Sequence, residues 1–554
     1  MNRLAYLVLF LLVTISINIS AQLFTRTAEI KEPSGLERGF GNVIAGVDFD
    51  ADGWPEIYAI NTNMVDGAYE VIPRIFKFEW NGTAWDSVWG AVPPTSIVEL
   101  QNTWPALAMG DLDNDNKPEL YWGIVNNFST VLNPARVLVY EYPGDGSDNM
   151  GVADGLGGFT PNAYTSIISD NSFNTRPVRF VIADPDNDGD DEIIYVDRVS
   201  SDYHVGVLSV DDIPDNGGGL ETWTLEFSGL GDINLSGSGA KWDVAVLNNY
   251  LYLFDGNLTD GSKVWPVKYS GGIWETLPGQ SGIAGGNSSF KGAQTVDING
   301  DGTKEIVVAE WLNDTTGRGS SVYLLQQSGD TLISTEIADM EPLGAARLNG
   351  CDYGDLDGDG NIDFVFGSRY EVENTAKVPI MRLEYQGGDI TNPANYVSSL
   401  IDSAYWTKNG DMDVICVANV DGDPEDEAMY TQGYSRGNAN DDPMPLIVLD
   451  MQFTPVSVEK ENDVVPAQFF VEQNFPNPFN PSTQIKFGIT EAANVNLIVY
   501  DALGREVATL VSNEYLNAGS YNIKFNASNL ASGIYIYKLT AGTNSVSRKM
   551  QLLK

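Results

Sequence analysis

One acidic pattern, D-x-D-x-D-G-x-x-E, recurs six times along this chain of 554 residues and restricts its fold more than any other feature. A short apolar run precedes and follows each copy, and we number the copies loop 1 to loop 6 in chain order. Self-similarity of this kind is the signature of a repeat architecture. Positions one, three, five and nine of the six loops are, in order, Asp48, Asp50, Asp52 and Glu56; Asp111, Asp113, Asp115 and Glu119; Asp184, Asp186, Asp188 and Glu192; Asp297, Asn299, Asp301 and Glu305; Asp355, Asp357, Asp359 and Asp363; and Asn419, Asp421, Asp423 and Glu427.

The spacing of the loops gives the number of repeats. Successive loops start 58 to 73 residues apart, except for a gap of 113 residues between loop 3 and loop 4. That gap is about two periods, and its middle, Lys241–Phe254, reads as two strands joined without an acidic loop. The sequence therefore predicts seven units of roughly 60 residues, a length typical of the four-stranded blades of β-propellers.

The repeating pattern of a unit is four strand-like runs, which predicts an antiparallel sheet. The seventh unit shows only three, so its sheet would leave an exposed edge unless another segment completed it. We expect Leu23–Ile30, which precedes the first unit, to cross over and supply that strand, with Val456–Val458 as the competing candidate. In the first unit the four runs are Asn42–Val47, Glu56–Ile60, Arg74–Trp80 and Trp85–Trp89.

The acidic loops have the chemistry of a calcium site. Carboxylates at alternate positions of a tight loop meet at one focus, where their mutual repulsion is relieved by a hard cation. Glycine at position six permits a positive φ, and a set of oxygen ligands suits Ca²⁺ better than zinc or copper. The sequence predicts up to six structural Ca²⁺ ions, held by the loop residues given above. Loop 6 has Asn419 at position one and Pro424 at position six, so we expect it to be distorted and to bind calcium weakly or not at all.

These loops and their flanking strands resemble the FG-GAP or VCBS repeat, the blade unit of integrin-α-like propellers. The resemblance covers about residues 23–455 and implies that positions one, three, five and nine ligate calcium through their side chains. Asn299, Asn419, Pro424 and the whole fourth unit depart from the family pattern. We predict an all-β fold in which residues 22–455 form a seven-bladed β-propeller.

The beginning of the chain predicts export. Arg3, an apolar run from Leu4 to Ile19 and the small residues that follow are typical of a secretory signal peptide, which we assign to residues 1–21 rather than to a membrane anchor. No later segment is apolar for long enough to span a membrane. The net charge of −45 would repel phosphate backbones, so no nucleic-acid partner is expected. Two cysteines, Cys351 and Cys416, make no disulfide framework, and both a single bridge and two buried thiols are left open.

A second module is expected after a polar linker at residues 456–467. Residues 468–554 contain short alternating runs separated by turns, which predicts a small Ig-like β-sandwich. The stretches QNFPNPFNPST, VYDALGREVATL, SGIYIYKL and KMQLLK resemble the type A C-terminal sorting domain of the type IX secretion system. The resemblance implies a Gram-negative, Bacteroidetes-type host, Sec export, contact with the type IX machinery, and a secreted or cell-surface location.

The sequence carries no clear enzymatic signature. It has no G-x-S-x-G elbow, P-loop or dinucleotide fingerprint, and we interpret its one histidine, His204, as a surface residue. We expect a non-enzymatic module that binds an extracellular glycan or protein, for example in cell adhesion. Candidate aromatic contacts are Trp54, Trp122, Trp242 and Trp311, for each of which packing in the interior is the alternative. A calcium-assisted polysaccharide lyase is the enzymatic alternative, and a structural surface-layer role is a third possibility.

Overall fold

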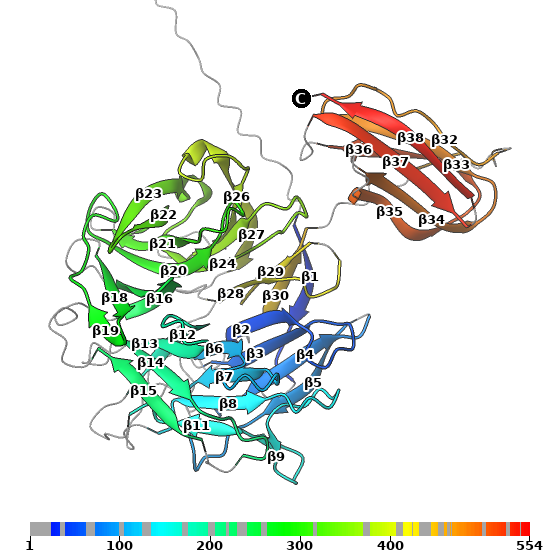
Figure 1. Ribbon diagram of the computed structural model, residues 1–554. Helices are drawn as coiled ribbons and strands as arrows, with labels where there is room; N and C mark the ends of the chain where they lie inside the picture. Colours follow the sequence, from blue (N-terminus) through cyan, green and yellow to red (C-terminus); the bar gives the residue numbers. More distant parts are fainter. Residues whose placement is uncertain are drawn as a thin grey trace, which may run out of the picture.

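The computed structural model is all-β (Figure 1). It describes residues 24–33, 39–62, 72–82, 84–98, 105–124, 134–168, 175–197, 205–217, 221–229, 241–255, 263–313, 318–368, 377–405, 414–423, 425–431, 445–451, 459–462, 466, 468–500, 506–527, 532–542 and 544–553. The predicted signal peptide at residues 1–21, His204, Pro424 and the alternative strand Val456–Val458 lie outside these ranges.

Between Thr25 and Asp450 the described residues form seven four-stranded antiparallel sheets, one for each predicted unit. Loops 1, 2 and 3 belong to units 1, 2 and 3, and loops 4, 5 and 6 to units 5, 6 and 7. The strands are β2 (Phe40–Val47), β3 (Glu56–Asn61), β4 (Ile75–Trp80) and β5 (Trp85–Ala91) in unit 1; β6 (Ala106–Gly110), β7 (Glu119–Gly123), β8 (Val137–Glu141) and β11 (Ala163–Thr165) in unit 2; β12 (Pro177–Ala183), β13 (Glu192–Asp197), β14 (Val205–Val210) and β15 (Trp223–Ser228) in unit 3; β16 (Lys241–Leu247), β17 (Tyr250–Asp255), β18 (Val264–Ser270) and β19 (Ile273–Thr276) in unit 4; β20 (Ser288–Val296), β21 (Glu305–Asn313), β22 (Ser321–Ser328) and β23 (Thr331–Asp339) in unit 5; β24 (Leu348–Gly354), β25 (Asp363–Ser368), β26 (Lys377–Tyr385) and β27 (Tyr396–Tyr405) in unit 6; and β28 (Ile415–Ala418), β29 (Glu427–Thr431), β30 (Leu446–Asp450) and β1 (Thr25–Ile30) in unit 7.

The seven sheets close into a ring (Figure 1). The first strand of each unit contacts the first strand of the next, from β2 through β6, β12, β16, β20 and β24 to β28, and β28 contacts β2 again. Strand β1 pairs antiparallel with β30, with Ile30 opposite Leu446. The prediction that the segment before unit 1 completes the last sheet is therefore confirmed.

The second strand of each sheet of the ring is buried on both faces. The second strand of unit 2, β7, is buried at every residue, and its side chains alternate between two cores. Leu120 packs with Tyr58 of unit 1, whereas Tyr121 packs with Ile193 of unit 3. Because side chains of a strand point alternately to opposite faces, near-continuous apolar runs in the second strands fit a sheet covered on both sides.

A short hairpin and two short helices interrupt the repeat. Unit 2 inserts β9 (Val152–Ala153) and β10 (Phe159–Thr160) before its last strand. Two 3₁₀ turns, η1 (Glu341–Leu343) and η2 (Pro393–Asn395), lie in units 5 and 6. Within the part of the chain that the structure describes, no helix has the length and apolarity needed to cross a bilayer.

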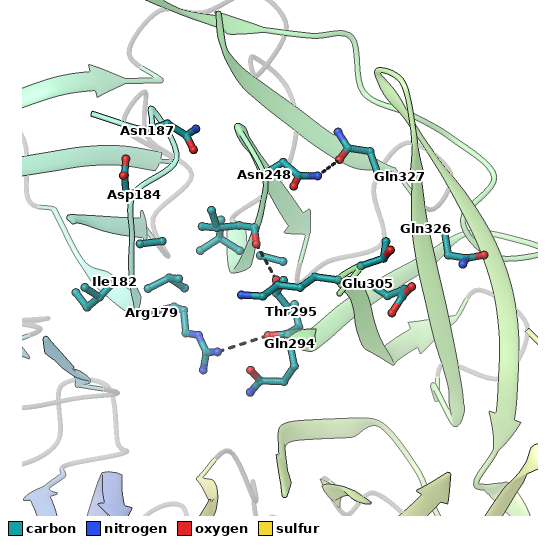
Figure 2. Close-up of a pocket in the computed structure, with 18 of the residues that line it drawn as sticks. Arg179, Ile182, Asp184, Asn187, Asn248, Gln294, Thr295, Glu305, Gln326 and Gln327 are labelled. Carbon is teal, nitrogen blue, oxygen red and sulfur yellow. Dashed lines mark hydrogen bonds between the residues drawn. The ribbon is translucent and has the colours of Figure 1, made fainter. Parts of the chain in front are cut away.

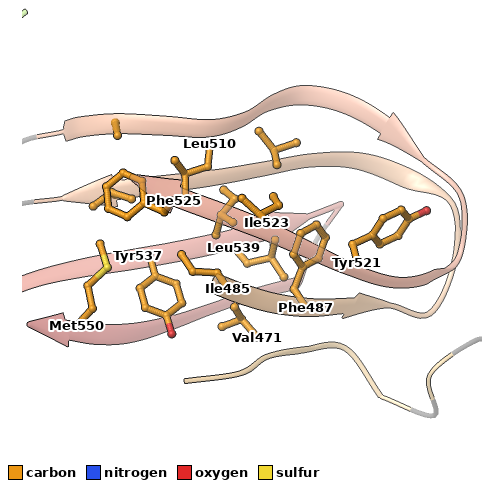
Figure 3. Close-up of a cluster of buried hydrophobic side chains, with 14 of the residues drawn as sticks. Val471, Ile485, Phe487, Leu510, Tyr521, Ile523, Phe525, Tyr537, Leu539 and Met550 are labelled. Atoms are coloured by element: carbon orange, nitrogen blue, oxygen red, sulfur yellow. The ribbon is translucent and has the colours of Figure 1, made fainter. Parts of the chain in front are cut away.

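The C-terminal unit has two four-stranded sheets around its own core (Figure 3). Phe487 and Tyr521 stack inside it with ring centroids 5.4 Å apart, and Leu539 is fully buried. Strand β31 lies inside the predicted linker 456–467 but pairs with β36, so part of that segment belongs to the C-terminal sheet. The strands are β31 (Glu459–Asn462), β32 (Phe470–Val471), β33 (Ser482–Ile489), β34 (Ala493–Tyr500), β35 (Glu506–Leu516), β36 (Gly519–Asn526), β37 (Gly533–Ala541) and β38 (Asn544–Leu552).

Candidate functional site

The acidic loops share one backbone geometry, which loop 1 illustrates. The carboxylate of Asp48, at position one, accepts the N–H groups of Asp52 at 3.1 Å and of Gly53 at 3.0 Å. Asp52, at position five, in turn accepts the N–H of Trp54 at 2.8 Å. Loops 2 to 5 repeat these three contacts. Each loop is therefore wound tightly around the carboxylate of its first residue.

Two positions of loops 1 to 5 adopt a left-handed backbone. Position six has a positive φ, as expected, for example 99° at Gly53 and 66° at Asn116. Position four does so as well, with φ of 59° at Ala51, 57° at Asn114 and 59° at Asn187. The sequence reasoning missed position four, although its occupants, asparagine or glycine in five loops, are the residues that tolerate this conformation.

The predicted ligand residues come together in space. Ligand oxygens of Asp111, Asp113, Asp115 and Glu119 all lie within 4.8 Å of one another. The same holds for Asp48, Asp50 and Glu56 in loop 1, and for Asp184, Asp186 and Glu192 in loop 3. Loop 6 differs, because Asn419 accepts the N–H of Gly422 at 2.9 Å through its side-chain oxygen and donates its amide to the backbone carbonyl of Glu425 at 3.1 Å.

The carboxylate at position nine is the buried member of each set. Glu119 begins β7, is fully buried and accepts the N–H of Leu112 at 3.2 Å. Removal from water raises the pKa of Glu119 to about 8, and it raises the pKa of Glu192 and of Glu427 to about 9. A buried carboxylate of this kind needs a partner of opposite charge to be held as an anion.

Four loops leave this buried carboxylate with one unused oxygen. Glu119 Oε1, Glu192 Oε2, Glu305 Oε2 and Glu427 Oε1 have no hydrogen-bond partner among the described residues. Each of these residues is at most 2% exposed. A buried acceptor without a partner costs about 1–3 kcal/mol, which makes the donor sets of loops 2, 3, 4 and 6 fit a hard cation. This set includes loop 6, for which the sequence predicted weak binding or none.

In loops 1 and 5, a buried cationic side chain instead bonds the carboxylates at positions three and nine. In loop 2, by contrast, Lys117 bonds the carboxylate at position five, Asp115, at 2.6 Å. The Nζ atom of Lys77 lies 2.8 Å from Asp50 Oδ2 and 2.9 Å from Glu56 Oε1. The guanidinium of Arg382 lies 2.6 Å from a carboxylate oxygen of Asp357 and 2.6 Å from one of Asp363. No motif within the loops signals these contacts, since both cations come from the third strand of the sheet.

A cavity of about 880 Å³ lies where unit 4 lacks its acidic loop (Figure 2). Its wall comes from loop 3, from the turn between β16 and β17, and from the end of loop 4. Amide side chains are frequent there, and Asn248 donates to Gln327 at 2.6 Å. Arg179 lies on one side, and its guanidinium donates to the backbone carbonyl of Ala293 at 3.5 Å. The sequence indicated that unit 4 lacks an acidic loop, but it did not predict the cavity that lies in its place.

Two family models match parts of the chain. The FG-GAP-like repeat model matches residues 48–122 and 297–366, which include loops 1, 2, 4 and 5. The model of the secretion system C-terminal sorting domain matches residues 473–552. The chain contains FG-GAP-like repeats and a secretion system sorting domain. Together they indicate a secreted β-propeller protein that type IX secretion delivers to the cell surface or the extracellular space.

Other comparisons add little. None of the curated proteins matches the sequence. Among solved structures, the N-terminal domain of Nup159 is similar with a TM-score of 0.34 and 8% identity, over 77% of this chain and 93% of that chain. An exo-β-1,3-galactanase from Clostridium thermocellum has a TM-score of 0.30 and 13% identity, over 77% of this chain and 100% of that chain. Both TM-scores are too low to support an argument.

The aromatic candidates of the FG-GAP-like units divide by burial. Trp122 is fully buried in the core between units 1 and 2, and Trp311 is 5% exposed, with Lys291 Nζ 3.9 Å from its ring centroid. Trp242 is half-buried against the same ammonium group, which lies 4.3 Å from its ring centroid. Trp54, at position seven of loop 1, is 37% exposed. Of the four candidates, Trp54 presents the most surface to a ligand.

The two cysteines of the units are both buried free thiols, and burial raises the pKa of each well above its usual value. Cys351 lies on β24 of unit 6 and Cys416 on β28 of the neighbouring unit 7.

Proposed function

We propose that this protein is a secreted or surface-attached, calcium-stabilised seven-bladed β-propeller that binds an extracellular glycan in the cavity beside unit 4. Its C-terminal Ig-like sandwich directs type IX secretion after Sec export, in a Gram-negative, Bacteroidetes-type host. The observation that carries the binding role is the cavity itself, since it replaces an acidic loop with an open wall of amide and hydroxyl groups.

Support for seven blades comes from the ring of sheets. Seven four-stranded sheets are described, and contact between β28 and β2 leaves no gap between the last and the first. Strand β1 covers the edge that β30 would otherwise expose. A closed set of antiparallel sheets is how propellers protect their strand edges.

Support for calcium comes from the donor sets. The side chains at positions one, three and nine of a loop would hold the ion. They are carboxylates except for Asn299 and Asn419, and the carboxylate at position five lies beside them. Bound calcium would supply the positive charge that buried carboxylates such as Glu192 lack. The role is structural, because the ion stabilises a loop that joins the first two strands of a unit.

Support for a glycan comes from the chemistry of the cavity wall. Asn187, Asn248, Gln294 and Gln327 each carry an amide, which both donates and accepts hydrogen bonds, as sugar hydroxyl groups do. Thr295 adds a hydroxyl group, although its Oγ1 donates to the carbonyl of Val246 at 2.9 Å. The volume of about 880 Å³ lies in the range of ligand sites, about 300–1,000 Å³.

A glycan array with a cavity-blocking variant tests this role. Thr303, at position seven of loop 4, lines the cavity, and the equivalent position of loop 1 already carries a tryptophan, Trp54. We expect Thr303→Trp to fill the cavity and to abolish binding of the glycan that the wild type retains. Asn361→Trp places the same side chain at position seven of loop 5 and should leave binding unchanged. Equal binding by all three proteins would exclude the cavity as the site.

A calcium-assisted polysaccharide lyase is the second candidate. Arg179 and Lys304 line the same cavity together with Glu305, a combination of cation and carboxylate that an elimination reaction could use. Incubation with acidic polysaccharides would then produce unsaturated sugars, which absorb in the ultraviolet. Binding on the array without such products favours the non-enzymatic role.

A further inference from the structure

The six acidic loops fall into two classes according to one residue of the third strand. In every unit with a loop, the residue at position eleven lies opposite a residue of the third strand. In units 1 and 6 that residue is a cation, and in the other four it is apolar. The opposed pairs are Tyr58 and Lys77, Val365 and Arg382, Tyr121 and Val139, Ile194 and Val207, Val307 and Leu324, and Met429 and Val448.

Lys77 makes its contacts inside the ligand set of loop 1. Its side chain is 1% exposed, and its ammonium group bonds Asp50 at position three and Glu56 at position nine, at 2.8 Å and 2.9 Å. A third carboxylate, Asp148 of unit 2, lies 3.0 Å away. Neither oxygen of Glu56 is among the buried atoms that lack a partner, in contrast to its counterparts in loops 2, 3, 4 and 6.

Arg382 repeats this arrangement five units further along the ring. Its side chain is 5% exposed, and it bonds Asp357 at position three and Asp363 at position nine, each at 2.6 Å. The second oxygen of Asp363 accepts the N–H of Leu356 at 2.9 Å. Asp357 keeps one buried oxygen without a partner among the described residues. Lysine and arginine thus reach the same two loop positions from the same place in the sheet.

These contacts compete with a metal for the same atoms. Calcium needs carboxylate oxygens at about 2.3–2.6 Å, and in loops 1 and 5 two of the four ligand positions already hold a buried cation. An ion in the same site would lie next to a buried positive charge. We infer that Lys77 and Arg382 are internal counter-ions that replace calcium in loops 1 and 5, so that only loops 2, 3, 4 and 6 take a divalent ion.

The two metal-independent loops flank the place where the ring closes. Units 1 and 6 are the neighbours of unit 7, in which the first strand β1 meets β30. The same seam contains a further ion pair, between Arg26 of β1 and Asp402 of unit 6 at 2.8 Å. Ion pairs of the protein itself therefore hold loops 1 and 5, in the two sheets next to unit 7, and join β1 to unit 6, whatever the calcium concentration.

The number of bound ions tests this inference, which rests on the calcium binding proposed above. Full-length protein would be dialysed against buffered calcium at about 0.15 M salt, which screens diffuse binding to its acidic surface, and its calcium counted by mass spectrometry. We expect four ions per wild-type chain. Lys77→Met and Arg382→Met free the ligand oxygens, and each should raise the count by one.

A variant that adds a cation beside a loop controls for effects of misfolding on the calcium count. Leu324 occupies the equivalent place beside loop 4, so Leu324→Lys should lower the count by one, whereas Leu324→Met should leave it at four. Six ions in the wild type, or unchanged counts in Lys77→Met, Arg382→Met and Leu324→Lys alike, would overturn the replacement of calcium by these side chains. A wild-type count of zero would instead refute calcium binding itself, and this inference with it.

Discussion

Removing calcium should lower the temperature at which the ring of sheets unfolds and leave the unfolding temperature of the C-terminal unit unchanged. Four loops hold a buried glutamate with an unused oxygen, and in our proposal each takes one ion. A chelator removes those ions from the folded state, in which alone the ligand set is assembled. The C-terminal unit has its own core and none of the acidic loops, so it is an internal control.

The expected magnitude follows from the number of sites. An ion present at about 100 times its dissociation constant stabilises the folded state by about 2.7 kcal/mol, so four ions contribute about 11 kcal/mol. Unfolding entropy of about 2.1 cal/mol/K per residue over the ring, predicted at residues 22–455, converts this loss into a drop in Tm of about 12 °C. A total stability of about 5–15 kcal/mol is usual for a folded domain, so the chelated ring would be marginal.

Tryptophan fluorescence separates the two transitions. All 12 tryptophans of the chain lie between Trp54 and Trp406, and none lies in residues 468–554. Fluorescence therefore follows the ring, while circular dichroism follows both units. A fluorescence midpoint that moves by less than about 2 °C on chelation, at saturating calcium in the control sample, would refute a structural role for the ions.

Three further predictions concern single features. Ala51 has a φ of 59°, so Ala51→Gly should raise the free energy of unfolding by about 0.5–1 kcal/mol, whereas Gly300→Ala, at a φ of 70°, should lower it; urea denaturation measures both. Burial raises the pKa of Asp352 to about 6, so the folded state binds this proton more tightly than the unfolded state, and the group's contribution to stability falls as pH rises from about 4 to 6. Asp352→Asn should thus match the wild type at pH 4 and exceed it by about 1–3 kcal/mol at pH 7, since an amide oxygen can still accept the N–H of Val417. Deletion of residues 468–554 should leave the protein in the periplasm, as cell fractionation would show.

The repeat made most of the fold predictable. Each acidic loop marks the turn between the first two strands of a unit, so the six loops give the positions of six sheets along the chain. The gap of 113 residues gives the position of the seventh. The crossing strand β1 followed from the need to cover a sheet edge. In the C-terminal unit, the alternation of apolar and polar residues predicted strands, as in β37 (Gly533–Ala541).

Features without a local signal were missed. The strand β31 carries the sequence Glu459–Asn462, whose four polar residues give no apolar alternation, and only its pairing with β36 reveals it. The hairpin of β9 and β10 has two residues in each strand, too few for any period. The cavity beside unit 4 could not be predicted, because it depends on how loops 3 and 4 are placed on either side of the missing loop. The spacing of motifs along the chain does not give that placement.

Lys77 and Arg382 illustrate a limit of reading metal sites from motifs. By motif alone, loops 1, 3 and 5 are the strongest candidates, with four carboxylates and a glycine each, whereas loop 4 has lost one carboxylate to Asn299. The structure supplies a charge that the motif omits, from a residue 21 positions after the end of loop 1 and 19 positions after the end of loop 5. The pairing of strands is what brings it there, because position eleven of the loop faces that residue. In such repeats, the residue opposite position eleven should therefore be read together with the loop: an apolar residue there leaves the site to a metal, and a lysine or arginine fills it.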